Sequence, residues 1–162
     1  MKYLGLLISS NGRMGKEVEA RIGSASRMIG GMNKAVLRMR ELSISTKLKV
    51  VYATMMPSLL YGCGVWNLTK QQQLRVQATQ MSVLRGIQGV SRMDRIRNKD
   101  IRQQLGQEGI LDLIRRRQKN WKCRLEEMSS ERTTKKGYVG VMEGRRPRGV
   151  QELQYSLKRY TN

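Results

Sequence analysis

Residues 14–39 read MGKEVEARIGSASRMIGGMNKAVLRM, and the pattern of this stretch decides the fold class. Apolar side chains recur at alternating intervals of four and three residues, at Val18, Ile22, Ala25, Ile29, Met32, Val36 and Met39. This heptad spacing places them along one stripe of a single helix. We interpret the stripe as the core face of a helical bundle, and a free coiled coil is the alternative interpretation.

Further helices are expected after this one, over residues 43–61, 70–87, 98–105 and 110–128. Ser43 or Ser45 can cap the first of them and Thr69 the second, because their hydroxyl groups accept hydrogen bonds from free backbone amides. The apolar spacing predicts that Leu74, Ala78, Met81 and Leu84 point inward. The predicted core residues across the bundle are Ile22, Ile29, Leu59, Tyr61, Trp66 and Trp121.

The two ends of the chain differ in character from this helical part. The segment before Asn11-Gly12 is mostly apolar, and that dipeptide favours a tight turn between strands. We therefore expect a strand or hairpin over residues 1–12, as the remnant of a larger sheet. Residues 129–162 are polar and basic, which predicts a flexible tail with a short helix over 151–160. The predicted fold is mainly α, with four to five bundled helices over 13–128 between the hairpin and the flexible basic tail.

The charge of the chain indicates a polyanionic partner. The sequence has 32 Lys and Arg against 12 Asp and Glu, a formal net charge of +20. Such a surplus repels itself in a folded protein and is best neutralised by nucleic acid, whether an RNA–DNA hybrid, RNA or DNA. A membrane surface and simple solubility are the alternatives. Basic residues occur in every segment instead of on one face of an amphipathic helix, so we expect no membrane partner.

The densest basic run lies on the last long helix and consists of Arg115, Arg116, Arg117, Lys119 and Lys122. Like charges on neighbouring helical positions are destabilising unless they meet an anion, so this run is our first candidate for a nucleic-acid face. A solvated face whose long side chains cover apolar surface is the alternative. The loop 91–97 is a second candidate, as a phosphate-contacting loop. The other predicted contacts are Arg92, Arg95, Arg97, Lys34, Arg38, Lys47 and Lys49.

The sequence lacks the residues that most catalytic and metal sites require. It has no histidine, and Cys63 and Cys123 lie in separate apolar segments. Zinc-finger spacing and a Cys-His nucleophile pair are therefore excluded. The aspartates stand alone at Asp94, Asp100 and Asp112, where they suit a loop and helix starts. We predict no catalytic residue, no metal site and no cofactor in this chain.

Four phrases resemble a known family: Tyr3-Leu4-Gly5, PSLLYGCGVW at 57–66, Asn98-Lys99-Asp100-Ile101 and RRRQKNW at 115–121. Together they resemble the C-terminal part of a LINE-type, non-long-terminal-repeat retrotransposon reverse transcriptase, over roughly residues 2–128. The resemblance implies that Tyr3, Leu4 and Gly5 belong to a primer-grip strand and that the helices after them form the thumb. Relatives carry a Gly-His pair shortly after the tryptophan, whereas Lys122-Cys123 follows it here.

The resemblance implies that the chain holds a template–primer duplex, with an RNA–DNA hybrid as the natural ligand and the missing palm and fingers domains as partners. The aspartate pair that binds two metal ions in these polymerases is absent, so the parent protein would be an RNA-directed DNA polymerase and this chain no enzyme. Two alternatives stay open: an independent DNA-binding regulatory or packaging protein, which a dimer through residues 18–39 would favour, and a degenerate element fragment without function. We expect an intracellular, nuclear protein. Two interpretations of Arg145-Arg146-Pro147-Arg148 stay open: a basic import signal, or the basic phrase that it resembles downstream in these reverse transcriptases.

Overall fold

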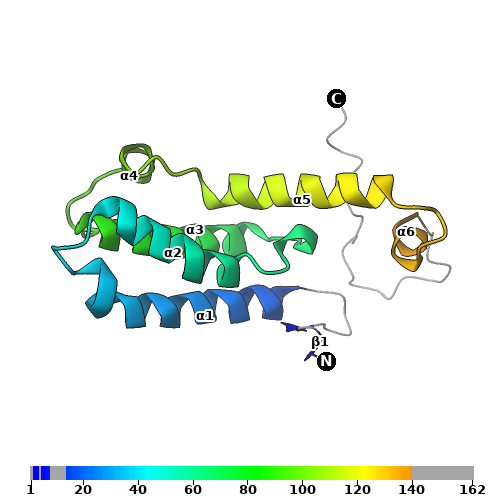
Figure 1. Ribbon diagram of the computed structural model, residues 1–162, viewed down its shortest axis with the longest axis horizontal. Coiled ribbons are helices and arrows are strands. Elements are labelled where there is room, and N and C mark those ends of the chain that lie inside the picture. Colours follow the sequence, from blue (N-terminus) through cyan, green and yellow to red (C-terminus); the bar gives the residue numbers. More distant parts are fainter. Residues whose placement is uncertain (1, 4, 8–13, 140–162) are drawn as a thin grey trace.

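A computed structural model of the chain describes residues 2–3, 5–7 and 14–139. Figure 1 shows its main helices in layers: α1 (Gly15–Met32) on one side, α2 (Ile44–Leu59) and α3 (Lys70–Gln88) in the middle, and α5 (Ile110–Glu127) on the other side. α1 contacts both α2 and α3, whereas α5 contacts α3 and the short 3-10 helix η2 (Cys63–Val65). The prediction of a mainly α fold, with an N-terminal hairpin before a helical bundle, is confirmed.

α1 follows the predicted stripe in its first part and departs from it after Met32. The stripe positions that it buries are Val18, Ile22 and Ala25. The residues that follow form a π-helical turn, η1 (Asn33–Leu37), which contains more residues per turn and so rotates the side chains after it. Leu37 therefore takes the buried position. The prediction that Met39 lies on the core stripe is wrong, because Met39 is 42% exposed.

Side-chain caps begin both central helices at residues that the sequence predicts. The Ser43 hydroxyl accepts a hydrogen bond from the Thr46 amide at 3.1 Å, at the start of α2. Thr69 and Gln72 form a capping box at the start of α3, with N–O distances of 3.3 and 3.0 Å. Each cap satisfies backbone amides that a helix leaves free at its N-terminus. Local sequence therefore sets where these helices start.

α3 lies at the centre of the bundle and buries more than one face. Its buried apolar residues are Val76, Met81, Val83, Leu84 and Ile87. Of the four residues predicted to point inward, Met81 and Leu84 are buried as expected, whereas Leu74 is 66% exposed and Ala78 is exposed as well. α3 packs against α1 and α2 as well as α5, and a single apolar stripe does not describe a helix with several packing partners.

Two short helices complete the C-terminal part of the described chain: α4 (Asn98–Gln104) and α6 (Thr133–Val139). Lys135 of α6 donates through Nζ to the carbonyls of Leu125 and Glu126, both at 2.9 Å. These bonds satisfy carbonyls that α5 leaves free at its C-terminus. The chain is thus helical just after the point where a flexible tail is predicted to begin. The predicted helix over 151–160 and the basic cluster at 145–148 lie outside the described residues.

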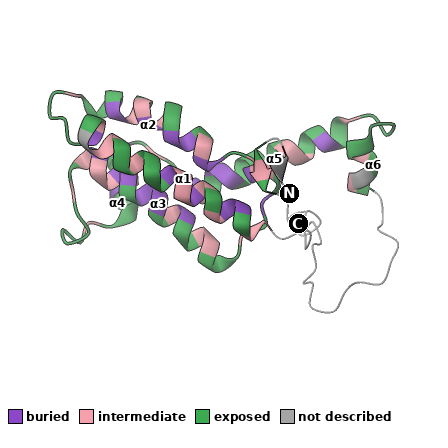
Figure 2. Cartoon of the chain, turned by 90° about the horizontal axis from the view of Figure 1, so that it is seen from below, coloured by how far each residue is buried: buried purple, intermediate pink, exposed green. Residues whose placement is uncertain are grey.

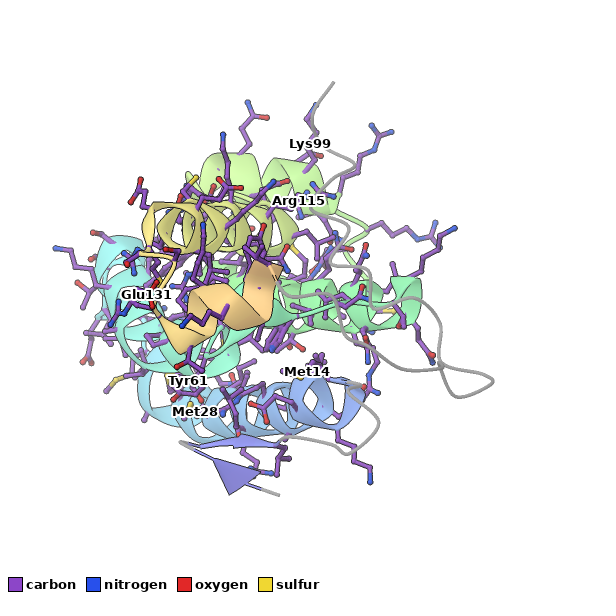
Figure 3. The ribbon with its side chains drawn as sticks, turned by 90° about the vertical axis from the view of Figure 1, so that its right-hand side faces the viewer. Met14, Met28, Tyr61, Lys99, Arg115 and Glu131 are labelled. Carbon is purple, nitrogen blue, oxygen red and sulfur yellow. The ribbon has the colours of Figure 1, made fainter. Side chains whose placement is uncertain are left out.

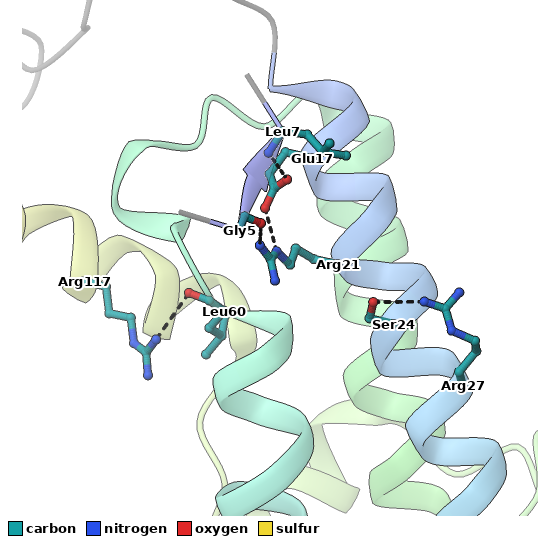
Figure 4. A network of polar contacts seen from close by, with 8 residues as sticks. All are labelled: Gly5, Leu7, Glu17, Arg21, Ser24, Arg27, Leu60 and Arg117. Carbon is teal, nitrogen blue, oxygen red and sulfur yellow. Dashed lines mark hydrogen bonds and ion pairs between the residues drawn. The ribbon is translucent and has the colours of Figure 1, made fainter. Parts of the chain in front are cut away.

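The N-terminal hairpin is formed by β1 (Lys2–Tyr3) and β2 (Leu6–Leu7), which pair antiparallel. Glu17 of α1, which is 1% exposed, connects the hairpin to the bundle. Its carboxylate accepts hydrogen bonds from the Leu7 amide at 2.7 Å and from Arg21 Nε at 2.6 Å. Arg21 also donates to the Gly5 carbonyl, which closes the network drawn in Figure 4. A buried carboxylate is tolerated here because several donors compensate its charge.

A glycine lets the hairpin approach the end of α2. Gly62 has a φ of +70°, in the left-handed region that favours glycine. A Cβ atom at this position would lie 2.7 Å from a methyl carbon of Leu6. Gly62 therefore combines a backbone turn with close contact between β2 and the segment after α2.

Three of the six residues expected in the core are buried, and Figure 2 shows the buried positions along the helices. The structure confirms as buried core residues Ile22, Leu59 and Trp66. Those that are half-buried are Ile29 and Trp121. The prediction for Tyr61 is wrong, since it is 44% exposed. Its ring instead lies against the Arg21 guanidinium, whose central carbon is 4.6 Å from the ring centroid, a cation–π contact at the surface.

Candidate nucleic-acid interface

The basic run on α5 is partly neutralised by acidic neighbours. Arg115 forms an ion pair with Asp112, almost one turn earlier on the same helix, at 2.9 Å. Arg116 binds both carboxylate oxygens of Glu108, at 2.6 and 3.1 Å. Exposed pairs of this kind contribute little to stability, and phosphate can compete for their arginines. They nevertheless lower the positive charge that this face presents.

The other members of the run have different surroundings. Lys122 pairs with Glu126 at 3.6 Å, and Lys119 is exposed, without a hydrogen bond or ion pair to the described residues. Arg117 donates to the Leu60 carbonyl at 3.4 Å (Figure 4). Because successive residues of an α-helix are rotated by about 100°, Arg117 lies on a different flank of α5 from Arg115. The structure therefore divides the run between two flanks of the helix.

Arg117 lines a shallow groove between η2 and α5, together with Trp121 and Arg124. Cys63, at the start of η2, lines the same groove. Burial raises the pKa of the Cys63 thiol above its usual value, although the charge of Arg117 opposes this shift. A thiol with a raised pKa stays neutral near pH 7 and is a poor nucleophile. The groove therefore offers two arginines beside an indole ring, without a reactive sulfur.

The loop between α3 and α4 presents the arginines that the sequence selected as phosphate contacts. Arg92, Arg95 and Arg97 are all exposed, and their side chains form no hydrogen bond or ion pair with any residue in the described ranges. Asp94 forms no ion pair with these three arginines, and its carboxylate accepts hydrogen bonds from the Ser91 amide at 2.6 Å and hydroxyl at 3.0 Å. These two bonds hold the pKa of Asp94 below its usual value.

Arg85, which the sequence analysis did not select, supports this loop from the last turn of α3. Its guanidinium donates to the Ser91 carbonyl at 3.0 Å and to the Ile96 carbonyl at 2.7 Å. It also donates to the Asn98 side chain at 3.0 Å. A basic residue in the last helical turn, shortly before Gly89, is the signal that could have indicated a role at the helix end.

The connection between η1 and α2 carries further exposed basic residues. Arg38 is exposed, as expected for a contact residue, and so is Arg40, which the sequence analysis missed. Neither side chain is joined to the described residues by a hydrogen bond or ion pair. Lys49 is exposed on α2. The side chain of Lys34 lies outside the described part of the structure.

Lys47 is the predicted contact residue that the structure contradicts. It is buried, and its Nζ donates to the Leu37 carbonyl at 2.9 Å. The ammonium group thus satisfies a carbonyl near the end of η1, while the aliphatic part of the side chain is covered by the bundle. Lys47 joins α2 to η1 and is not accessible to a phosphate.

Arginines from two connections lie at the same end of the bundle. Figures 1 and 2 both show the connections over 38–43 and 89–97 at the left end of the bundle, and in Figure 2 they lie on different sides of that end. Leu37 and Gly86 pack closely there, since a Cβ atom at Gly86 would lie 3.1 Å from the Leu37 side chain. We call the following residues the arginine-rich end: Arg38, Arg40, Arg92, Arg95 and Arg97.

The primer-grip-like residues lie far from the arginine-rich end. Tyr3 is part of β1, and Gly5 forms the turn of the hairpin with a φ of +80°, whereas Leu4 lies outside the described residues. The hairpin packs at the opposite end of α1 (Figure 1). Figure 3 adds that Lys99 and Arg115 lie on the same side of the molecule, across the bundle from Met28 of α1.

Comparison of the chain with protein-family models, with curated proteins and with solved structures finds no match. Over the described ranges, no helix has both the length and the apolar character that crossing a bilayer requires. In the same ranges, no three Cys, Asp or Glu side chains gather into a group that could hold a metal ion.

Proposed function

We propose that this protein binds a nucleic-acid duplex along its phosphate backbone, and that the arginine-rich end makes the main contact. The observation that carries this proposal is a set of exposed guanidinium groups at one end of the bundle, none paired with a carboxylate among the described residues. A chain with a net charge of +20 is suited to a polyanion at such a surface. The α5 run is the weaker candidate, because Arg115, Arg116 and Lys122 each pair with an acid.

Arginine is suited to this role because its planar guanidinium donates two parallel hydrogen bonds to phosphate oxygens. Each phosphate neutralised releases a condensed counterion, so log K falls linearly with log salt. If all five residues of the arginine-rich end neutralise one phosphate each, the slope on duplex DNA is about −4.5. Contacts of this kind position the protein and are nearly independent of base sequence.

Within this class of ligand, we propose the template–primer duplex of a retrotransposon reverse transcriptase, with preference for an RNA–DNA hybrid. The support is the set of sequence phrases over residues 2–128 that resemble the primer-grip strand and thumb of that family. The chain would hold the duplex, and nucleotide addition would belong to palm and fingers domains of the parent protein. A nuclear location is part of the same proposal.

The packing of the bundle argues against a dimer of the independent regulator through residues 18–39. Val18, Ile22 and Ala25 of the heptad stripe are buried in the bundle, where α1 packs on α2 and α3. The same apolar surface cannot also form a coiled coil with a second copy while the bundle stays folded. A degenerate fragment without function would fold without binding nucleic acid, and the experiment below separates this alternative from the proposal.

The test is fluorescence-polarisation binding of the full chain over a salt series. The ligands are an RNA–DNA hybrid, duplex DNA and single strands of matched length. One variant carries Arg92, Arg95 and Arg97 changed to Gln. The control variant carries Arg115, Arg116 and Lys119 changed to Gln, so both variants lose three positive charges.

We expect the loop variant to lower the steepness of the salt slope by about 2 to 3, and the control variant by less than about 1. Equal effects of the two variants would show that total charge, not the arginine-rich end, governs binding. Stronger binding to the hybrid supports the template–primer proposal, and stronger binding to duplex DNA favours the regulator. Absence of salt-dependent binding by the wild-type chain would refute the proposed function.

A further inference from the structure

Met93 stands out among the large apolar side chains of the described residues, because 88% of its surface is exposed. It lies in the loop between α3 and α4, directly after Arg92 and two residues before Arg95. Single exposed apolar residues are common on protein surfaces and need no explanation by themselves. What distinguishes Met93 is the loop that carries it.

Hydrogen bonds support this loop on both sides of Met93. The Met93 amide donates to the Ser91 hydroxyl oxygen at 3.1 Å, and Ser91 in turn donates to the Asp94 carboxylate. Arg85 bonds the carbonyls at either end of the loop, those of Ser91 and Ile96. Contact through such a loop requires little additional ordering of the backbone, which favours binding.

The surroundings of Met93 indicate the chemistry of its partner. Its exposed neighbours Arg92, Arg95 and Arg97 form no ion pair with a carboxylate in the described part of the chain, Asp94 included. An apolar protein surface would have to desolvate these three guanidinium groups without compensating them. Met93 needs an apolar surface, and the arginines need anions. A nucleic-acid duplex supplies both, since it has phosphates for the arginines and an apolar base stack between the backbones.

We propose that Met93 is a wedge that enters between two base pairs of a bound duplex while the arginines beside it bind the flanking phosphates. This inference rests on the proposed function and names the contact through which the loop would act. Apolar side chains such as methionine, inserted between base steps, partly unstack and bend a duplex. Methionine is unbranched and adaptable, so it can follow the shape of the opened step. Burial of its side chain offsets part of the unstacking free energy.

The experiment uses duplexes that carry 2-aminopurine at successive positions, since the fluorescence of this base rises when it loses its stacking partner. Both an RNA–DNA hybrid and duplex DNA are measured with the full chain. The variants are Met93→Ala, which removes the wedge, and Met93→Leu, which keeps an apolar side chain of similar volume. The matched control is Met28→Ala, because Met28 is an exposed methionine of α1 that follows Arg27 but lies on a helix.

We expect wild-type protein to raise the fluorescence of 2-aminopurine in the duplex, and Met93→Ala to abolish most of that rise. Affinity should fall by about three- to tenfold in Met93→Ala, from the lost burial of one side chain. Its salt slope should stay unchanged, because no charge is removed. Met93→Leu should keep most of the rise, and Met28→Ala should behave as wild type.

The outcomes separate this inference from the proposed function. Salt-dependent binding without a rise in fluorescence, or a rise that survives in Met93→Ala, would refute the wedge and leave phosphate binding standing. In that case Met93 would be a contact for another protein or no contact at all. Absence of binding by wild-type protein would refute both proposals together.

Discussion

Gln80→Leu tests how α5 is held in place. Gln80 of α3 is 1% exposed, and its side-chain amide spans to the start of α5. Its Nε2 donates to the Glu108 carbonyl at 2.9 Å, and its Oε1 accepts from the Ile110 amide at 3.0 Å. The N-cap residue of α5 is Gly109, which has no side chain to cap the helix. Gln80 therefore supplies from another helix the acceptor that a local cap would provide.

The expected loss of stability follows from these two bonds. Leucine has nearly the volume of glutamine and neither donates nor accepts, so the Ile110 amide would be left buried without a partner. An unsatisfied buried donor costs about 1 to 3 kcal/mol, and the lost bond to Glu108 about 1 kcal/mol more. We therefore expect Gln80→Leu to lower the free energy of unfolding by about 2 to 4 kcal/mol. For a chain of this length the melting temperature should fall by roughly 5 to 15 °C.

The assay is urea denaturation followed by circular dichroism at 222 nm, with Gln88→Leu as the matched control. Gln88 lies on the same helix and donates to the Gln104 side chain at 2.7 Å in an exposed bond. Water can replace Gln88 as the partner of Gln104, so the control should lose less than about 1 kcal/mol. If Gln80→Leu unfolds at the same urea concentration as wild type, or no earlier than the control, the capping role assigned to Gln80 is refuted.

Two further predictions concern the cysteines and the loop aspartate. A maleimide should label exposed Cys123 quickly in the native protein and buried Cys63 only on unfolding, so mass spectrometry that finds equal rates would contradict the packing of η2. The Ser91 hydrogen bonds hold the pKa of Asp94 below its usual 3.8, so the stabilisation that they give is complete above about pH 4 and is lost as the pH falls through the lowered pKa. An NMR titration of the Ser91 amide should show this, and a midpoint above 3.8 would contradict it.

The features that sequence analysis predicted correctly depend on neighbours in the chain. Ser43 and Thr69 bond to amides three residues away, so their capping roles are visible in the sequence itself. Val18, Ile22 and Ala25 form a buried stripe because helical spacing alone places them on one face. The basic composition is likewise independent of the fold, and it still carries the proposal of a nucleic-acid partner.

The features that it missed depend on residues that packing brings together. Lys47 is spaced like a solvent-facing residue, but the Leu37 carbonyl ten residues away gives its ammonium group a buried partner. Leu74 has the spacing of a core residue, but no helix of the described chain covers it and it is exposed. Helical periodicity predicts which residues share a face, but it does not predict which face another helix covers.

The same limit applies to the candidate interface. From the sequence, the α5 run was the strongest candidate site because its charges are densest. The ion pair of Arg115 with Asp112 joins residues three positions apart, so it is visible in the local sequence as well. Tertiary structure added the rest: Arg117 turns towards the end of α2, and two separate connections place their arginines at one end of the bundle. Charge density is a property of the chain, whereas the charge left free for a phosphate depends on which carboxylates and carbonyls the fold places within hydrogen-bonding distance.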